Sequence, residues 1–219
     1  MDANSRKVTV PVGPVNLAAD LVIPASSHGV VAFAHGSGSG RFSPRNQYVA
    51  SQLNGVGLAT VLADLLTPDE ERADAATGHL RFDIDLLTTR VTALVDWLTS
   101  DAVGTGRRIG LFGASTGAAA ALAAAAKRPG DVAATVSRGG RPDLAGDALR
   151  RVHQPTLLIV GGSDHTVLDL NRQAMQTLAG PTRLEVVPHA SHLFEEPGAL
   201  EQVASLASDW FAAHLTHDA

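Results

Sequence analysis

Hydrophobic residues follow two patterns along the chain, and the two patterns predict two kinds of element. Short, nearly continuous apolar runs are typical of strands buried on both faces, whereas apolar residues three or four positions apart indicate amphipathic helices. The predicted strands lie at residues 7–10, 17–23, 29–34, 58–64, 108–112, 132–136, 156–160 and 183–187. The predicted helices lie at residues 46–53, 82–98, 117–127, 143–152, 168–178 and 200–215.

The order of these elements predicts the fold class. Strands that alternate with helices are joined by right-handed crossovers and form a parallel sheet, whereas the first two strands, joined by a turn at Gly13-Pro14, form an antiparallel hairpin. We therefore expect an α/β fold with a doubly wound, mostly parallel sheet of about eight strands, an antiparallel N-terminal strand and helices on both faces. The charged stretch 67–80 indicates a solvated loop or a frayed helix.

Length and continuity predict one domain over residues 1–219, because no repeat, linker or break in composition divides the chain. The connection at 137–155 is too short for an inserted cap domain. We therefore expect no cap, a shallow site and a small substrate, although the stretch 67–80 could still fold over the pocket.

Composition excludes several classes of protein. A net charge of −5 without a basic stripe argues against nucleic acid as a partner. The chain has no cysteine, which excludes disulfides, thiolate metal sites and a cysteine nucleophile. The polar first ten residues do not predict a signal peptide, and no apolar run is long enough to span a membrane, so we expect a cytoplasmic protein without a membrane partner.

The sequence Gly113-Ala114-Ser115-Thr116-Gly117 has the form G-x-S-x-G between a predicted strand and a predicted helix. That context is typical of a nucleophile elbow, in which glycines make room for a sharp turn and the serine hydroxyl projects outward. Taken alone, the motif could also be an ordinary tight turn. The sequence predicts Ser115 as a nucleophile.

A serine nucleophile needs a base and a group that orients the base. Catalytic side chains in such sheets follow the carboxyl ends of strands, in the order serine, acid, histidine. Asp164 follows the strand at 156–160, and His192 follows the strand at 183–187. We therefore predict that His192 accepts the proton of Ser115 and that Asp164 orients His192.

Other residues compete for these roles. Asp164 could instead cap the next helix, with Asp169 as the acid. His189 and His165 are alternative bases. His35 is better explained as a residue that organises its loop through backbone contacts.

The tetrahedral intermediate needs an oxyanion hole of backbone N–H groups. The sequence predicts the N–H of Thr116, directly after the nucleophile, as one donor. The glycine-rich loop 35–40 follows an earlier central strand and predicts the N–H of Ser37 as the second donor, with Gly38 as the alternative.

Four arginines follow strands or loops that lead into the predicted site: Arg41, Arg45, Arg138 and Arg141. Arginine holds carboxylates in a fork of donors. We expect Arg41 and Arg138 to bind an anionic group of the substrate. The alternative is that such arginines pair with local acids such as Asp143 or Asp147.

Neither a metal nor a nucleotide cofactor is predicted. The pair His189 and His192 has no helix or acidic partner that would complete a metal site. The loop 36–40 lacks the G-x-G-x-x-G spacing of a dinucleotide-binding turn. We therefore expect no cofactor.

Four short motifs occur in order, each after a predicted strand, and they lie at residues 35–38, 113–117, 161–164 and 189–194. With them the chain resembles the α/β-hydrolase fold and, within it, the dienelactone-hydrolase-like small hydrolases. The resemblance implies hydrolysis of esters or lactones through an acyl-enzyme. The family resemblance implies a cysteine nucleophile for dienelactone hydrolase itself, whereas this chain has Ser115 at the corresponding position. This difference favours a carboxylesterase-like activity. The chain also resembles hydrolase domains fused to phosphoribosyltransferase domains, although these residues include no second domain of that kind.

The sequence thus predicts a cofactor-free serine hydrolase whose partner is a small ester or lactone. An acyltransferase or peptidase on the same three side chains, and a non-catalytic binding protein with this fold, stay open as alternatives. A homodimer also stays open.

Overall fold

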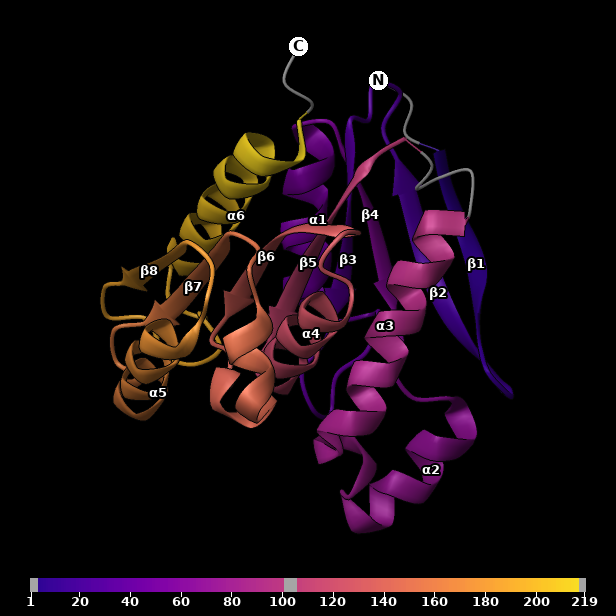
Figure 1. The fold of residues 1–219 in the computed structure, drawn as a ribbon, viewed down its shortest axis with the longest axis horizontal. Coiled ribbons are helices and arrows are strands. Elements are labelled where there is room, and N and C mark those ends of the chain that lie inside the picture. The colour runs from indigo at the N-terminus through magenta and orange to yellow at the C-terminus, as the bar shows by residue number, and fades with distance from the viewer. Residues whose placement is uncertain (1–3, 101–105, 217–219) are drawn as a thin grey trace.

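The computed structural model describes residues 4–100 and 106–216, and its centre is one eight-stranded sheet in the order β1-β2-β4-β3-β5-β6-β7-β8 (Figure 1). The strands are β1 (Asn4–Val12), β2 (Val15–Ile23), β3 (Gly29–Ala34), β4 (Leu58–Ala63), β5 (Arg108–Ala114), β6 (Val132–Arg138), β7 (Thr156–Gly161) and β8 (Thr182–Val187). β2 is antiparallel to both β1 and β4, and every other pair is parallel. The expected α/β sheet and its antiparallel start are confirmed.

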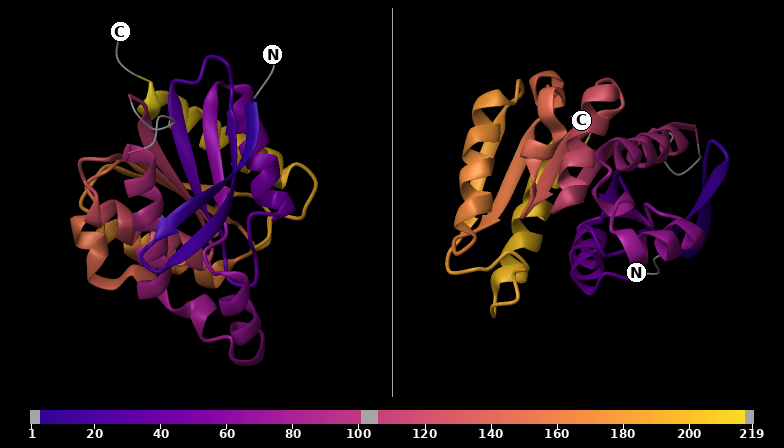
Figure 2. Two further views of the ribbon diagram at one scale, coloured as in Figure 1. Left: turned by 90° about the vertical axis from the view of Figure 1, so that its right-hand side faces the viewer. Right: turned by 90° about the horizontal axis from the view of Figure 1, so that it is seen from below.

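Helices cover both faces of this sheet (Figure 2). They are α1 (Pro44–Gly55), α2 (Pro68–Thr77), α3 (Ile84–Ser100), α4 (Thr116–Lys127), α5 (His165–Thr177) and α6 (Ala199–Leu215), with the short 3-10 helices η1 (Leu80–Phe82) and η2 (Pro142–Arg151). α1 and α6 pack together on one face, whereas α3 and α4 pack together on the other, where η2 and α5 continue the layer. Within the described ranges, no helix is both long and apolar enough to cross a membrane.

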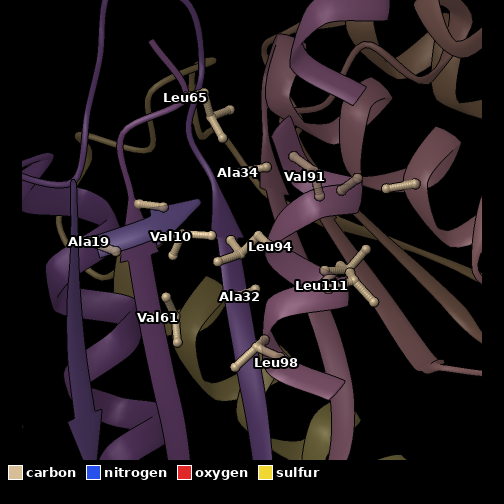
Figure 3. Close-up of a cluster of buried hydrophobic side chains, with 14 of the residues drawn as sticks. Val10, Ala19, Ala32, Ala34, Val61, Leu65, Val91, Leu94, Leu98 and Leu111 are labelled. Atoms are coloured by element: carbon tan, nitrogen blue, oxygen red, sulfur yellow. The ribbon is translucent and has the colours of Figure 1, made fainter. Parts of the chain in front are cut away.

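Each helical layer has its own apolar cluster against the sheet. One cluster joins Val91, Leu94 and Leu98 of α3 to inward-facing residues of the central strands, as Figure 3 shows. The opposite cluster joins α1 and α6 to the other face, where the rings of Phe33 and Phe112 lie 4.8 Å apart. Because both faces are covered, β3 and β4 are buried along their whole length, which explains their continuous apolar sequences.

The segment 143–152, expected to be helical, forms η2, which is a kinked 3-10 helix. Gly146 has φ 53°, a left-handed conformation that interrupts regular helix. Pro142 begins the segment, and η2 alone fills the connection between β6 and β7, with no cap domain there.

The stretch 67–80 contains the helix α2, in line with the helical alternative. Thr67 accepts from the N–H of Glu70 while Glu70 accepts from the N–H of Thr67, a capping box that fixes the start of the helix. α2 buries only Asp74, and it is tied to its surroundings by the pairs Glu70–Arg90 at 2.6 Å and Asp74–Arg81 at 2.5 Å. In Figure 1 it projects beyond the rest of the molecule. Polar contacts therefore hold α2 in place.

Candidate active site

Ser115 lies at the turn between β5 and α4 with φ 51° and ψ −122°. Residues other than glycine rarely adopt this backbone conformation. Its N–H donates to the carbonyl of Arg138 at 3.2 Å. A Cβ at Gly117 would lie 2.2 Å from the carbonyl oxygen of Ala34, and one at Gly113 would lie 2.4 Å from a backbone carbon of α4. Both glycines of the motif are thus required by close backbone approach.

Three side chains predicted from the sequence lie in a hydrogen-bonded line. His192 Nδ1 is 2.6 Å from Asp164 Oδ2, and His192 Nε2 is 3.3 Å from Ser115 Oγ. A carboxylate only accepts, so Nδ1 carries the proton when the imidazole is neutral, and Nε2 is left to accept from the serine hydroxyl. The acid follows β7 and the histidine follows β8, both at the carboxyl edge of the sheet.

The competing acids and bases lie elsewhere. Asp169 pairs with Arg172 at 3.0 Å on the exposed side of α5. Asp164 occupies the N-cap position of α5 but makes no capping hydrogen bond with its side chain. His165 and His189 are exposed to solvent. Within the described residues, His192 is the histidine that reaches Ser115.

Thr116 and Ser37, the predicted oxyanion donors, contact each other. Thr116 begins α4, and the first N–H groups of a helix have no partner within it. The N–H of Ser37 donates to the Thr116 hydroxyl at 3.0 Å. A Cβ at Gly36 would lie 3.1 Å from Ser115 Cβ, so this loop passes directly over the nucleophile. Sequence reasoning missed the Thr116 hydroxyl, although a hydroxyl residue beside the nucleophile was visible in the motif.

His35 organises its loop through the backbone, as its sequence context suggested. Its Nε2 accepts from the N–H of Leu65 at 3.0 Å, so Nδ1 carries the proton and donates to the carbonyl of Gly36 at 2.9 Å. Burial lowers the pKa of His35 below the ordinary value. Both ring nitrogens are therefore engaged away from Ser115.

The arginines near the site have different surroundings. Arg41 binds two carboxylates of the protein itself, Asp64 and, at 3.4 Å, Asp20. These partners differ from the acids that the sequence suggested, and they hold the guanidinium where a substrate contact was expected. Arg141 pairs with Asp143 at 2.7 Å, as the alternative interpretation predicted.

Arg138 is different, because it is only 7% exposed and its Nε and Nη1 atoms have no hydrogen-bond partner in the described chain. Burial lowers the pKa of Arg138 to about 10, and the positive charge of Arg45 acts in the same direction. The guanidinium therefore remains charged at neutral pH, with no carboxylate paired to it in residues 4–100 and 106–216.

A cavity of about 830 Å³ adjoins the loop over Ser115. Its wall includes the loop from His35 to Arg45, and α2 closes the far side through Pro68, Glu71 and Asp74. Burial and the charge of Asp64 raise the pKa of Glu71 in this wall, opposed by Arg41. The cavity thus combines charged groups of both signs with space for a small molecule.

Comparisons with known proteins bear on the family and the fold. The model of the "Dienelactone hydrolase family" matches residues 17–215. A dienelactone hydrolase structure from Anabaena variabilis is 56% identical, with a TM-score of 0.96, 97% of this chain and 99% of that chain being covered. Est1E from Butyrivibrio proteoclasticus shares the fold at 17% identity and a TM-score of 0.79, over 94% of this chain and 98% of its own.

Two curated relatives from Mycobacterium tuberculosis strains carry another name, "Putative phosphoribosyl transferase". Each is 56% identical over 210 residues, which are 96% of this chain and 46% of the relative. The chain therefore spans about half the length of these relatives.

Proposed function

The chain belongs to the dienelactone hydrolase family, and from that premise we propose that it is a serine hydrolase that cleaves small carboxylic esters or lactones through an acyl-enzyme on Ser115. The observation that carries the proposal is the line of hydrogen bonds from Asp164 through His192 to Ser115, at 2.6 and 3.3 Å. This line supplies an alcohol, a base and a group that orients the base.

In the first step Ser115 Oγ attacks the substrate carbonyl while its proton passes to His192 Nε2. The Asp164 carboxylate stabilises the imidazolium that forms and keeps Nδ1 protonated. The imidazolium then donates its proton to the leaving alkoxide as the ester bond breaks, which leaves an acyl group on Ser115. Water, deprotonated by His192, releases the acid and restores the serine.

The developing oxyanion is stabilised by the N–H groups of Thr116 and Ser37. The Ser37 N–H points at the Thr116 hydroxyl in the free protein, 3.0 Å away. The substrate oxygen replaces that hydroxyl as the acceptor, so the Thr116 side chain holds the loop in position before substrate arrives. Loss of one such donor typically lowers kcat by about 10²–10³-fold.

The size of the proposed substrate follows from the surroundings of the triad. The connection between β6 and β7, in which a cap would be inserted, spans residues 139–155 and contains one short element, the ten-residue η2. The adjoining cavity holds about 830 Å³, within the range of pockets for small ligands. Both features favour a small or flexible acyl compound.

The proposal is tested with 4-nitrophenyl butyrate and a fluorophosphonate probe. We expect the wild type to hydrolyse the ester and to be labelled, and the folded Ser115→Ala variant to do neither. Ser51→Ala, an exposed serine on α1, is the matched control and should retain both properties. Labelling that persists in Ser115→Ala, or a folded wild type that neither cleaves nor is labelled, would overturn the proposal.

A further inference from the structure

The backbone of the nucleophile is bound by the segment 138–141, which leads from β6 into η2. The N–H of Ser115 donates to the carbonyl of Arg138 at 3.2 Å, and the N–H of Arg141 donates to the carbonyl of Ser115 at 3.1 Å. A residue with φ 51° keeps such a conformation only where its surroundings impose it. The segment 138–141 is therefore part of the structure that holds Ser115 in its turn.

The same segment contacts the base. A Cβ at Gly139, which has φ 51°, would lie 3.1 Å from the carbonyl oxygen of His192 and 3.5 Å from its Nδ1. The N–H of Gly139 donates to the carbonyl of Ile159 in β7 at 2.7 Å, which attaches the first half of the segment to the sheet. A displacement of the segment would therefore act on the nucleophile and on the base together.

A buried amide attaches the second half of the segment. Asn171 of α5 is fully buried, and its Nδ2 donates to the carbonyl of Gly140 at 2.9 Å and to the carbonyl of Val167 at 2.8 Å. The two N–H groups of the amide are thus both used. Gly140 is buried as well, so water could not replace Asn171 as the donor to its carbonyl without an opening of the structure.

The helix α5 thereby fixes two parts of the candidate site. Asp164 occupies its N-cap position, and the N–H of Leu168 donates to the Asp164 carbonyl at 2.9 Å. Asn171 follows Asp164 by about two helical turns and binds the segment beside Ser115. One rigid helix therefore sets the position of the acid and, through Gly140, that of the nucleophile.

We propose that Asn171 is a positioning residue for hydrolysis at Ser115: it holds the segment 138–141 through Gly140, and the segment holds Ser115 within reach of His192. This proposal rests on the proposed hydrolase function and adds a residue to it. The contact between His192 Nε2 and Ser115 Oγ is already long, 3.3 Å, so a small further separation would break it. Because Asn171 is fully buried, its loss should slow the chemical step and leave substrate binding nearly unchanged.

The chain offers a matched control at the opposite edge of the sheet. Gln154 precedes β7 and is 5% exposed, and its Nε2 donates to the carbonyl of Ala125 near the end of α4 at 2.9 Å. In Gln154, as in Asn171, the amide oxygen has no hydrogen-bond partner among the described residues. Asn171→Leu and Gln154→Met each remove one such amide at nearly constant size, so both should lower the melting temperature to a similar extent.

The first test is the hydrolysis of 4-nitrophenyl butyrate. We expect Asn171→Leu to lower kcat by about 10- to 100-fold, as a small misplacement of a reacting group does, and to change KM by less than about threefold. The rate of labelling by the fluorophosphonate probe should fall with kcat, whereas Gln154→Met should keep both wild-type rates. Asn171→Ala removes the same donors without added bulk and should behave as Asn171→Leu does. Unchanged turnover and labelling in the folded Asn171 variants, or an equal loss in Gln154→Met, would overturn the proposal.

The second test follows the segment without turnover. Amide hydrogen exchange in peptides that cover residues 113–117 and 138–142 should be about tenfold or more faster in Asn171→Leu than in Gln154→Met, because the segment opens locally. Equal exchange in the two variants would refute the role of Asn171, and faster exchange in 138–142 alone would refute its link to Ser115. If exchange accelerates in both peptides but the wild type cleaves no ester, the hydrolase proposal fails while the hold of Asn171 on the turn stands.

Discussion

The backbone of Ser115 should store strain that a change of one side chain can release. With φ 51° and ψ −122°, the Cβ of residue 115 is forced into a region that glycine occupies freely. Ser115→Gly removes Cβ, whereas Ser115→Ala keeps it. Both variants lose the hydroxyl and its 3.3 Å contact with His192, so their comparison isolates the backbone.

The magnitude follows from two opposing effects. Strain of this kind amounts to about 1–3 kcal/mol, and glycine costs about 0.5–1 kcal/mol through the greater freedom of the unfolded chain. Ser115→Gly should therefore be more stable than Ser115→Ala by roughly 0.5–2 kcal/mol. For a chain of this length the entropy of unfolding is roughly 0.5 kcal/mol per kelvin, so the melting temperatures should differ by about 1–4 °C.

The assay is calorimetry or circular dichroism melting of both variants at one pH. The control is the same pair of substitutions at Ser51, in the helix α1, where glycine is the poorer residue by about 1 kcal/mol and Ser51→Gly should melt below Ser51→Ala. The two sites thus have opposite expected signs. If Ser115→Gly melts at or below Ser115→Ala, the nucleophile is not strained and the reasoning fails.

Three further predictions concern the base, the packing of the elbow and the response to pH. Asp164→Asn keeps the size of the side chain but no longer holds His192 in the tautomer that accepts a proton from Ser115. We therefore expect kcat to fall by about 10⁴-fold with little change in KM. A loss of less than tenfold in steady-state kinetics would contradict the orienting role of Asp164. Gly117→Ala places a Cβ 2.2 Å from the carbonyl oxygen of Ala34. We therefore expect this substitution to lower the free energy of unfolding in urea by about 3 kcal/mol or more. An unchanged midpoint would rule out the close approach of residue 117 to Ala34. Because burial lowers the pKa of His35 in the folded state, the unfolded chain binds the extra proton, and stability should decrease as pH falls below about 6.5 until the lowered pKa is passed. His35→Asn should show a shallower decrease, measured by urea unfolding at several pH values, and an identical slope would exclude His35 as a cause.

Much of the fold could be predicted because strands that are buried on both faces have short, continuously apolar sequences. β3 and β7 are covered on both faces, and their sequences are continuously apolar. η2 could not be predicted as a 3-10 segment, because its apolar spacing is also compatible with an α-helix and the left-handed φ of Gly146 is a tertiary outcome. α1 extends two residues beyond the expected range at each end, where Ser43 caps its start, and α5 begins three residues earlier than expected.

The candidate site was predictable where order along the chain carries the information. Ser115, Asp164 and His192 each follow a strand of a parallel sheet, so topology brings them to one edge. The partner of Arg41 was not predictable, because Asp64 lies 23 residues away and meets it only through the packing of neighbouring strands. The unpaired state of Arg138 likewise depends on which side chains surround it in space.

The attachment of α2 makes one wall of the cavity depend on two largely buried charge pairs. Its ties are charge pairs, Glu70 with Arg90 and Asp74 with Arg81, and it contributes no buried apolar side chain. Dissolved salt screens such largely buried pairs much less than exposed ones, so this wall should keep its place in concentrated electrolyte. The shape of the cavity is therefore fixed by individual carboxylates and guanidinium groups, and the exchange of one of them should alter the space open to a small molecule while the sheet stays folded.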